Sequence, residues 1–230
     1  MYVLSYAALL AGFAVAAPPE TFVLPIAITN GSTPLIYEVG KVPLDTNYIT
    51  QPNATSYEWW YFDAVASDLS QHVVFQPIVD YNEDGNEPLN LRLSYSFANG
   101  SFQELIIPKE KLFVSTIGQG SAGISSDGAF SWQASPDLSQ YTLTLALEDI
   151  GISGQIQLQS IAPPHVACSA TYPGARLEYH WDLLWVNLLP DSVASVNLMV
   201  NGTAIAFEGS GYHDKACPTI DFKAPLKLTL

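Results

Sequence analysis

Two short stretches of the chain concentrate side chains that can do acid–base and hydrogen-bond chemistry, and the first is Tyr57–Ala64. Alternation along a β-strand would put a carboxylate among aromatic rings on each face, with Glu58, Trp60 and Phe62 on one face and Trp59, Tyr61 and Asp63 on the other. A carboxylate beside aromatic rings loses hydration and needs a hydrogen-bond partner. The alternative is a core strand whose acids lie at its ends.

The second stretch is Gly209–Lys215, which follows the last predicted hairpin and is expected to be a loop. Its glycines permit close backbone approach. Tyr212, His213, Asp214 and Lys215 all carry hydrogen-bond donors or acceptors. The alternative to a functional site is a polar clasp that ties the C-terminal strand to the rest of the fold.

Other motifs exclude common chemistries. Residues 118–123 match G-x-G-x-x-G, but turn residues follow where a dinucleotide site needs a helix, so we expect a flexible loop there. The histidines (His72, His165, His180 and His213) form no H-E-x-x-H pattern, and no G-x-S-x-G is present. We therefore expect no metal, no cofactor and no serine-hydrolase nucleophile.

Composition indicates a folded, acidic protein. Hydrophobic residues make up 48% of the 230 residues and charged residues 13%, which favours a substantial core. The formal net charge of -14 would repel nucleic acid, and no Lys/Arg cluster favours an anionic membrane surface. The oligomeric state cannot be predicted.

The elements expected to position the two stretches are short strands rich in Val, Ile, Thr, Tyr and Phe. The predicted strands are 58–66, 71–79, 89–97, 102–108, 112–117, 129–133, 141–147, 155–161, 177–188, 195–200 and 203–208. Asn99-Gly100 and Asn201-Gly202 are typical of hairpin turns. The pattern predicts an all-β, antiparallel barrel or sandwich over residues 56–230, after an irregular arm at 17–55.

The N-terminus has the pattern of a secretion signal. An apolar run from Tyr2 to Ala17 is too short for a typical membrane span, and Ala14-Val15-Ala16 supplies the small residues of a cleavage site. We expect a signal peptide at 1–16 and no transmembrane span after its removal. Because no Lys or Arg precedes the run, a buried or anchoring segment is the alternative.

Four sequons and two cysteines agree with a secretory or extracellular location. The acceptor pattern occurs at Asn30, Asn53, Asn99 and Asn201. Cys168 and Cys217 would form a disulfide in an oxidising compartment, and two separate buried thiols are the alternative.

Three features in order resemble a known family: Glu58–Ala64, Trp185 before a Pro-containing turn, and Gly211–Asp214. Together they are similar to the carotenoid-hydratase-like, AttH-type lipocalin superfamily, whose fungal branch contains lipocalin-like Diels–Alderases. The resemblance covers about residues 55–215. It implies a lipocalin-like β fold of which this chain is the first of two β domains, with a ligand pocket near the domain junction.

The resemblance also implies a function. The fungal cyclases fold a linear polyene for an intramolecular [4+2] cycloaddition, so the expected partner is an apolar polyene or polyketide-derived molecule. Glu58, Tyr212 and Asp214 are the candidate catalytic groups. The candidate substrate-binding residues are Trp60, Tyr95, Trp185 and His213.

Departures from the family pattern keep alternatives open. The Tyr-His-Asp motif runs into Lys215–Pro218 instead of a further Asn-Trp pair, so one wall of a shared pocket would be lacking. One alternative is an alkene hydratase in which Asp214, beside His213, donates a proton. The other is a secreted, non-catalytic carrier of an apolar ligand.

Overall fold

A computed structural model describes residues 19–34, 38–81, 88–166, 172–180 and 183–218. The regular secondary structure of the described residues is antiparallel sheet, apart from one short 3₁₀ turn, η1 (Glu148–Ile150). The all-β prediction is confirmed. Among the described residues there is no helix with the length and hydrophobicity to cross a bilayer.

The described strands form one curled sheet, and their bounds follow the alternation of apolar residues in the sequence. The strands are β1 (Thr21–Leu24), β2 (Tyr57–Ala66), β3 (His72–Asp80), β4 (Leu89–Ser96), β5 (Phe102–Pro108), β6 (Leu112–Ile117), β7 (Gly120–Ser125), β8 (Phe130–Ala134), β9 (Gln140–Leu147), β10 (Ile152–Ser160), β11 (Glu178–His180), β12 (Leu183–Val200) and β13 (Thr203–Pro218).

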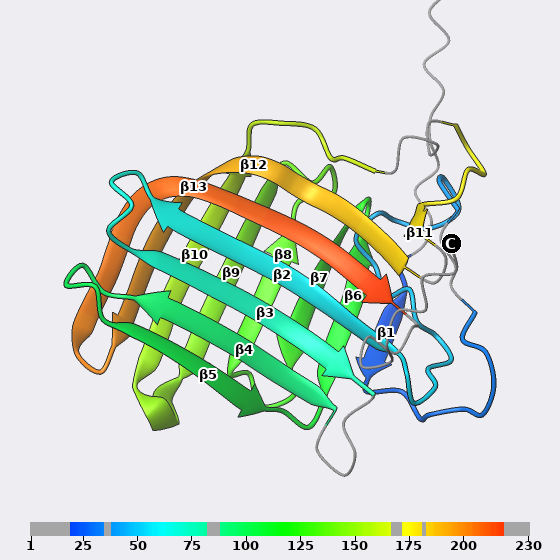
Figure 1. The fold of residues 1–230 in the computed structure, drawn as a ribbon, viewed down its shortest axis with the longest axis horizontal. Helices are drawn as coiled ribbons and strands as arrows, with labels where there is room; N and C mark the ends of the chain where they lie inside the picture. The colour runs from blue at the N-terminus through cyan, green and yellow to red at the C-terminus, as the bar shows by residue number, and fades with distance from the viewer. Residues whose placement is uncertain (1–18, 35–37, 82–87, 167–171, 181–182, 219–230) are drawn as a thin grey trace, which may run out of the picture.

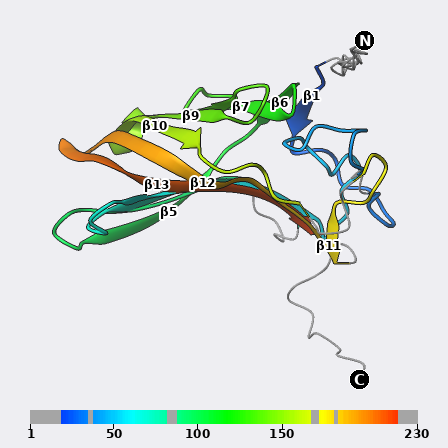
Figure 2. The same ribbon diagram turned by 90° about the horizontal axis from the view of Figure 1, so that it is seen from above.

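The spatial order is β1-β6-β7-β8-β9-β10-β12-β13-β2-β3-β4-β5, and β11 pairs with β12. In Figure 1 the front layer contains β2 to β5, and β6 to β10 cross behind it. Figure 2 shows the same sheet from above, folded into two layers. Because β1 and β5 are opposite edges of the order, the sheet is a half-barrel rather than a closed one.

The long hairpin of β12 and β13 belongs to both layers. The half of the hairpin nearest its turn continues the back layer, since β10 pairs with β12 from Ser192 to Val200. The other half of β13, from Gly209 to Ala216, pairs with β2 in the front layer. Register shifts in β12 between Asn187 and Ser192 provide the bend.

This hairpin corrects three sequence predictions. The strands predicted at 177–188 and 195–200 are joined by β12, because the proline after Leu189 lies at a bulge rather than a turn. The loop predicted at Gly209–Lys215 is the second half of β13. Gly209 and Gly211 do allow close approach, but to neighbouring strands: a Cβ at Gly209 would overlap the carbonyl of Val65.

The glycine-rich motif at 118–123 is also a structural element, not a flexible loop. A turn with Gly118 at φ 61° leads into β7. A Cβ at Gly123 would overlap the ring of Trp132, so this glycine makes room for the largest aromatic ring of the back layer.

The two predicted hairpin turns are confirmed. Asn201 and Gly202 have φ values of 49° and 80°, as a type I′ turn requires, and join β12 to β13. Asn99 and Gly100 lie in the loop between β4 and β5, where Gly100 has a φ of 82°.

Part of the predicted irregular arm is built into the fold. β1 pairs with β6 at the edge of the back layer. Residues 45–49 are all buried, and Tyr48 and Ile49 are each only 1% exposed. The arm therefore closes one end of the core between the two layers, although most of it has no regular structure, as predicted.

Gly211 offers a test of the bend in β13. A Cβ there would lie 2.6 Å from Leu158 Cδ2, 2.9 Å from Ser192 Oγ and 3.1 Å from the carbonyl oxygen of Asp63. Gly211→Ala is expected to lower the free energy of unfolding by about 1–3 kcal/mol, the usual cost of overpacking. Urea unfolding measures it, with Ser210→Ala at the exposed neighbouring position as control. Equal midpoints for the two variants would contradict the close approach.

Candidate functional site: two faces of one strand pair

Pairing of β2 with β13 divides the predicted site residues between two faces. In the antiparallel register, His213 is opposite Phe62, Asp214 opposite Tyr61 and Lys215 opposite Trp60. Glu58, Trp60, His213 and Lys215 are 0–2% exposed and point into the core. Trp59, Tyr61, Asp63 and Tyr212 are partly exposed on the outer face, which confirms the predicted division of β2 into two faces.

On the inner face, Asp45 is the centre of a hydrogen-bond network. Its carboxylate accepts hydrogen bonds from Trp60 Nε1 at 2.9 Å, Ser121 Oγ at 2.6 Å and Tyr141 Oη at 2.9 Å. Trp132 Nε1 in turn donates to Ser121 Oγ at 2.9 Å. We refer to these residues, with His213, as the inner network.

His213 completes the inner network from β13. Its Nδ1 lies 2.8 Å from the Tyr61 carbonyl oxygen, which can only accept, so Nδ1 carries a proton. Nε2 lies 3.8 Å from Asp45 Oδ2, and the ring stacks on Phe62 at 3.8 Å. Burial alone would raise the pKa of Asp45, but His213, Ser121 and Lys215 outweigh it and hold that pKa below its ordinary value.

A second buried pair lies beside this network. Lys215 Nζ is 2.7 Å from Glu58 Oε1 and 3.2 Å from the centre of the Trp60 ring. Glu58 Oε1 also accepts the backbone N–H of Tyr48 at 2.8 Å. Burial raises the pKa of Glu58 and lowers the pKa of Lys215, and the ion pair opposes both shifts.

These inner groups have their polar atoms directed at one another inside the core. Trp60 and Trp132 pack at 5.1 Å between ring centres, and both are at most 1% exposed. The structure therefore places the predicted residues Glu58, Trp60 and His213 in a buried network that ties the arm to the sheet. Sequence analysis missed Asp45, because an Asp-Thr-Asn run in an irregular segment is more typical of a solvated turn.

The outer face carries the accessible chemistry. Asp214, 9% exposed, accepts hydrogen bonds from Trp59 Nε1 at 3.1 Å and Trp185 Nε1 at 2.8 Å. The hydroxyl of Tyr212 lies 2.9 Å from Asp214 Oδ2 and also contacts Asn187 Oδ1. We call the following residues the outer cluster: Trp59, Tyr61, Asp63, Trp185, Asn187, Tyr212 and Asp214.

The hydrogen-bond pattern assigns roles within the outer cluster. An indole N–H can only donate, so Asp214 is held as an acceptor by two of them. The Tyr212 hydroxyl has one proton and two acceptors, Asp214 and Asn187. Burial, followed by the charge of Asp214, raises the pKa of Tyr212 above its ordinary value, so its hydroxyl keeps the proton.

Asp63 is a second carboxyl in the outer cluster. It lies beside Tyr61, whose ring meets the Tyr212 ring edge-on at 6.2 Å. Burial raises the pKa of Asp63, and Asp214 adds to that rise, while Tyr61 and His72 oppose it. This carboxyl is consequently easier to protonate than an ordinary aspartate.

One further predicted residue, Tyr95, lies apart from both the inner network and the outer cluster. Tyr95 is 4% exposed on the inner side of β4, opposite Val73, and packs against Phe97 at 5.6 Å. His213 and Asp214 are neighbours in sequence, but alternation directs them to opposite faces, so His213 cannot assist Asp214 as predicted for a hydratase.

The predicted disulfide remains a prediction. Cys217 is a buried free thiol on the inner face, and burial raises its pKa. Cys168 lies outside the described residues, as do residues 1–18, which include the predicted signal peptide. Among the described residues no group of three or more His, Cys, Asp or Glu side chains could hold a metal ion.

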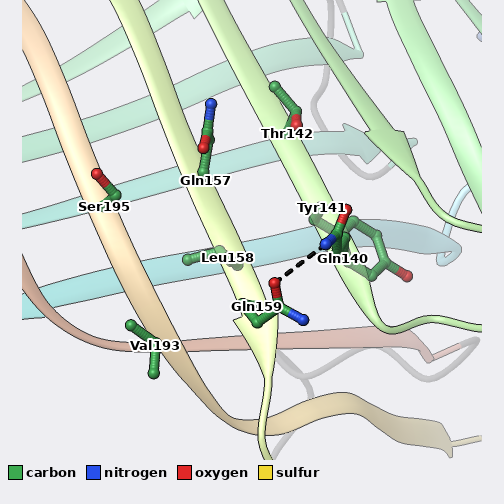
Figure 3. Close-up of a pocket in the computed structure, with 8 residues that line it drawn as sticks. All are labelled: Gln140, Tyr141, Thr142, Gln157, Leu158, Gln159, Val193 and Ser195. Atoms are coloured by element: carbon green, nitrogen blue, oxygen red, sulfur yellow. Dashed lines mark hydrogen bonds between the residues drawn. The ribbon is translucent and has the colours of Figure 1, made fainter.

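The outer face of the back layer contrasts with the outer cluster. A shallow pocket of about 160 Å³ there is lined by neutral residues of β9, β10 and β12. Figure 3 shows Gln140, Gln157 and Gln159 along it, with Gln140 Nε2 donating to Gln159 Oε1 at 3.0 Å. The glutamine amides along this pocket supply no acid or base.

Comparison with known proteins identifies the family. A sequence model of the Diels-Alderase-like family matches residues 40–224. This chain belongs to the Diels-Alderase-like family. The matched range contains both the inner network and the outer cluster, so the resemblance predicted from β2 and β13 is confirmed.

Relatives with curated names fall into two groups. The chain is 31% identical over 168 residues to the quinolone epoxide rearrangement protein asqO of Emericella nidulans, covering 70% of this chain and 46% of that protein. It is 25% identical over 190 residues to the Diels-Alderase pyiF of Pyricularia grisea, covering 78% and 44%. The chain thus spans about half the length of these relatives.

A solved structure supports the fold. The crystal structure of CghA superposes with a TM-score of 0.66 at 17% identity, covering 87% of this chain and 56% of that one. CghA has also been crystallised with Sch210972. At this identity the likeness concerns the fold alone.

The buried ion pair yields a test. Lys215→Met leaves Glu58 buried without its partner and is expected to lower the free energy of unfolding by about 3–5 kcal/mol. The double variant Glu58→Gln with Lys215→Met removes both charges and should be more stable than Lys215→Met alone. Urea unfolding of the wild type, Glu58→Gln, Lys215→Met and the double variant measures the coupling free energy between the two side chains. Lys111→Met, at a surface pair, is the control and should change stability by less than about 1 kcal/mol. Additive losses would contradict the pairing.

Proposed function

We propose that this chain acts as a Diels–Alderase-type cyclase of fungal secondary metabolism, binding a linear polyene against the outer cluster for intramolecular [4+2] cycloaddition. The observation that carries the proposal is the outer cluster itself. Its aromatic side chains surround the Tyr212 hydroxyl, whose one proton has two acceptors, Asn187 and Asp214, and can turn from them to a bound ligand. The family match and the Diels-Alderases of Pyricularia grisea and Chaetomium globosum support this chemistry.

The first contribution of the outer cluster is orientation. Trp59, Trp185 (37% exposed) and Tyr61 offer ring faces at the front of the sheet. A polyene held against them samples fewer conformers, so diene and dienophile meet more often in the reactive arrangement. Orientation can supply up to about 7–11 kcal/mol in favourable intramolecular reactions.

The second contribution is a hydrogen bond to the dienophile. Turning the Tyr212 hydroxyl toward a bound carbonyl costs Asp214 one donor but leaves both indole N–H groups in place. The donated hydrogen bond withdraws electron density from the conjugated alkene and stabilises charge in the transition state. Tyr212 is thus the proposed catalytic donor and Asp214 the residue that positions it.

Cyclisation of a linear polyene substrate tests this proposal. Tyr212→Phe is expected to lower the rate about 10- to 100-fold while binding is retained, because one transition-state hydrogen bond is lost. Chromatography of the cyclised product measures the rate, with Tyr172→Phe at an exposed loop position as control. A wild-type rate equal to that in buffer would exclude the cyclase, and an unchanged ligand that stays bound would favour the carrier.

A second candidate is acid-promoted rearrangement of an epoxide. It is favoured by the identity to the rearrangement proteins of Emericella nidulans and Penicillium thymicola, and by the raised pKa of Asp63. The Asp63 carboxyl would give its proton to the epoxide oxygen as a ring C–O bond breaks, and would regain it after the rearrangement.

Asp63→Asn separates this candidate from the cyclase. It should abolish epoxide rearrangement and leave a cycloaddition rate within about twofold, because a pericyclic reaction needs no proton transfer. Alkene hydration, with an acid of the outer cluster as donor, would instead incorporate labelled solvent oxygen into the product.

The secretory location is also part of the proposal. The sequons differ in how accessible their asparagine side chains are. Asn30, Asn99 and Asn201 are exposed, whereas Asn53 donates through Nδ2 to the Gly31 carbonyl at 2.9 Å. Expression of the full chain in a fungal host should yield a protein that begins at Ala17 with glycans at the exposed sites. Intact mass before and after N-glycan removal measures this. An unprocessed, glycan-free protein would contradict secretion.

A further inference from the structure

The strands β2 to β5 carry a single Lys or Arg, at a position in register with the outer cluster. Arg92 is the only Lys or Arg within β2 to β5, in a chain with a formal net charge of -14. On β4 the inward positions are Leu89, Leu91 and Leu93, all 0% exposed, so Arg92 faces outward. It therefore shares the face of the outer cluster.

Strand pairing places Arg92 in a row with Asp214. Asp214 is opposite Tyr61, the ladder between β2 and β3 brings Tyr61 opposite Gln76, and Gln76 is opposite Arg92. Neighbouring strands lie about 4.8 Å apart, so three steps separate Asp214 from Arg92 by about 14 Å at the backbone. A molecule lying across the strands would contact both.

The guanidinium of Arg92 has no acceptor in the described part of the chain. Its Nε is buried and makes no hydrogen bond there. The nearest acids on this face are Glu104, which is opposite Ser94 on β5, and Asp63 on β2, but neither is paired with Arg92 among the described residues. A buried N–H donor without an acceptor costs free energy that a bound ligand can recover.

We propose that Arg92 is an anchor for a carboxylate of the substrate, whose apolar chain extends across β3 and β2 to the outer cluster. This inference rests on the proposed function, since it assumes that the outer cluster binds substrate. The planar fork of Arg matches the two oxygens of a carboxylate. The substrate class is therefore an acidic polyene rather than a neutral one.

Paired probes that differ only in charge test the anchor. We would titrate the full chain with all-trans-retinoic acid and with its methyl ester, following the quenching of tryptophan fluorescence. The acid should bind about tenfold more tightly than the ester, as expected for one charge-assisted hydrogen-bonded pair. Arg92→Gln should bind both with the affinity of the ester. Lys111→Gln, which removes a charge elsewhere, should retain the preference.

The variant Trp185→Ala separates the proposed anchor at Arg92 from the proposed binding of ligand at the outer cluster. If the acid and ester bind equally to the wild type and Trp185→Ala weakens both, the anchor is wrong and the outer cluster remains a binding site. If the acid preference survives in Arg92→Gln, the anchor is likewise overturned. Binding of neither probe would overturn both the anchor and the proposed binding face.

Discussion

Every functional feature of this molecule depends on the antiparallel ladder between β2 and β13. The ladder gives two strands in register, so that Phe62 is opposite His213 and Tyr61 opposite Asp214. A slip of one residue would move His213 and Lys215 to solvent and bury Tyr212 and Asp214 among apolar side chains. The ladder exists only because β12 and β13 bend out of the back layer at their bulges and glycines.

The inner network and the Glu58–Lys215 pair beside it oppose such a slip. Asp45, Glu58, His213 and Lys215 are all buried, and each needs its partner because an isolated charge in the core is costly. The network also joins the arm to both layers, since Asp45 binds Trp60 of β2, Ser121 of β7 and Tyr141 of β9. We expect these buried polar groups to contribute more to specificity of register than to net stability.

Because the inner residues are buried and face one another, the partly exposed groups that a ligand can reach lie on the outer face. There the two indoles hold Asp214 as an acceptor, Tyr212 keeps its proton, and burial makes Asp63 easier to protonate than an ordinary aspartate. A hydrogen-bond donor and a carboxyl of raised pKa on one aromatic surface suit both reaction types named among the relatives. Under the proposed function, the reaction would depend on whether the substrate presents a dienophile carbonyl or an epoxide oxygen.

The sequence by itself determined the all-β class, most strand positions, both hairpin turns and the two faces of β2, because these follow from local alternation and turn chemistry. It also pointed to the family through Glu58–Ala64 and Gly211–Asp214. It could not show that Gly209–Lys215 is a strand, because its glycines are explained only by the backbone of β2 beside them. Nor could it find Asp45 or place Arg92 in the row of Asp214, since both relations join residues far apart in the chain. Only the tertiary structure decided which predicted residues are buried and which are accessible, because burial depends on what packs against each face.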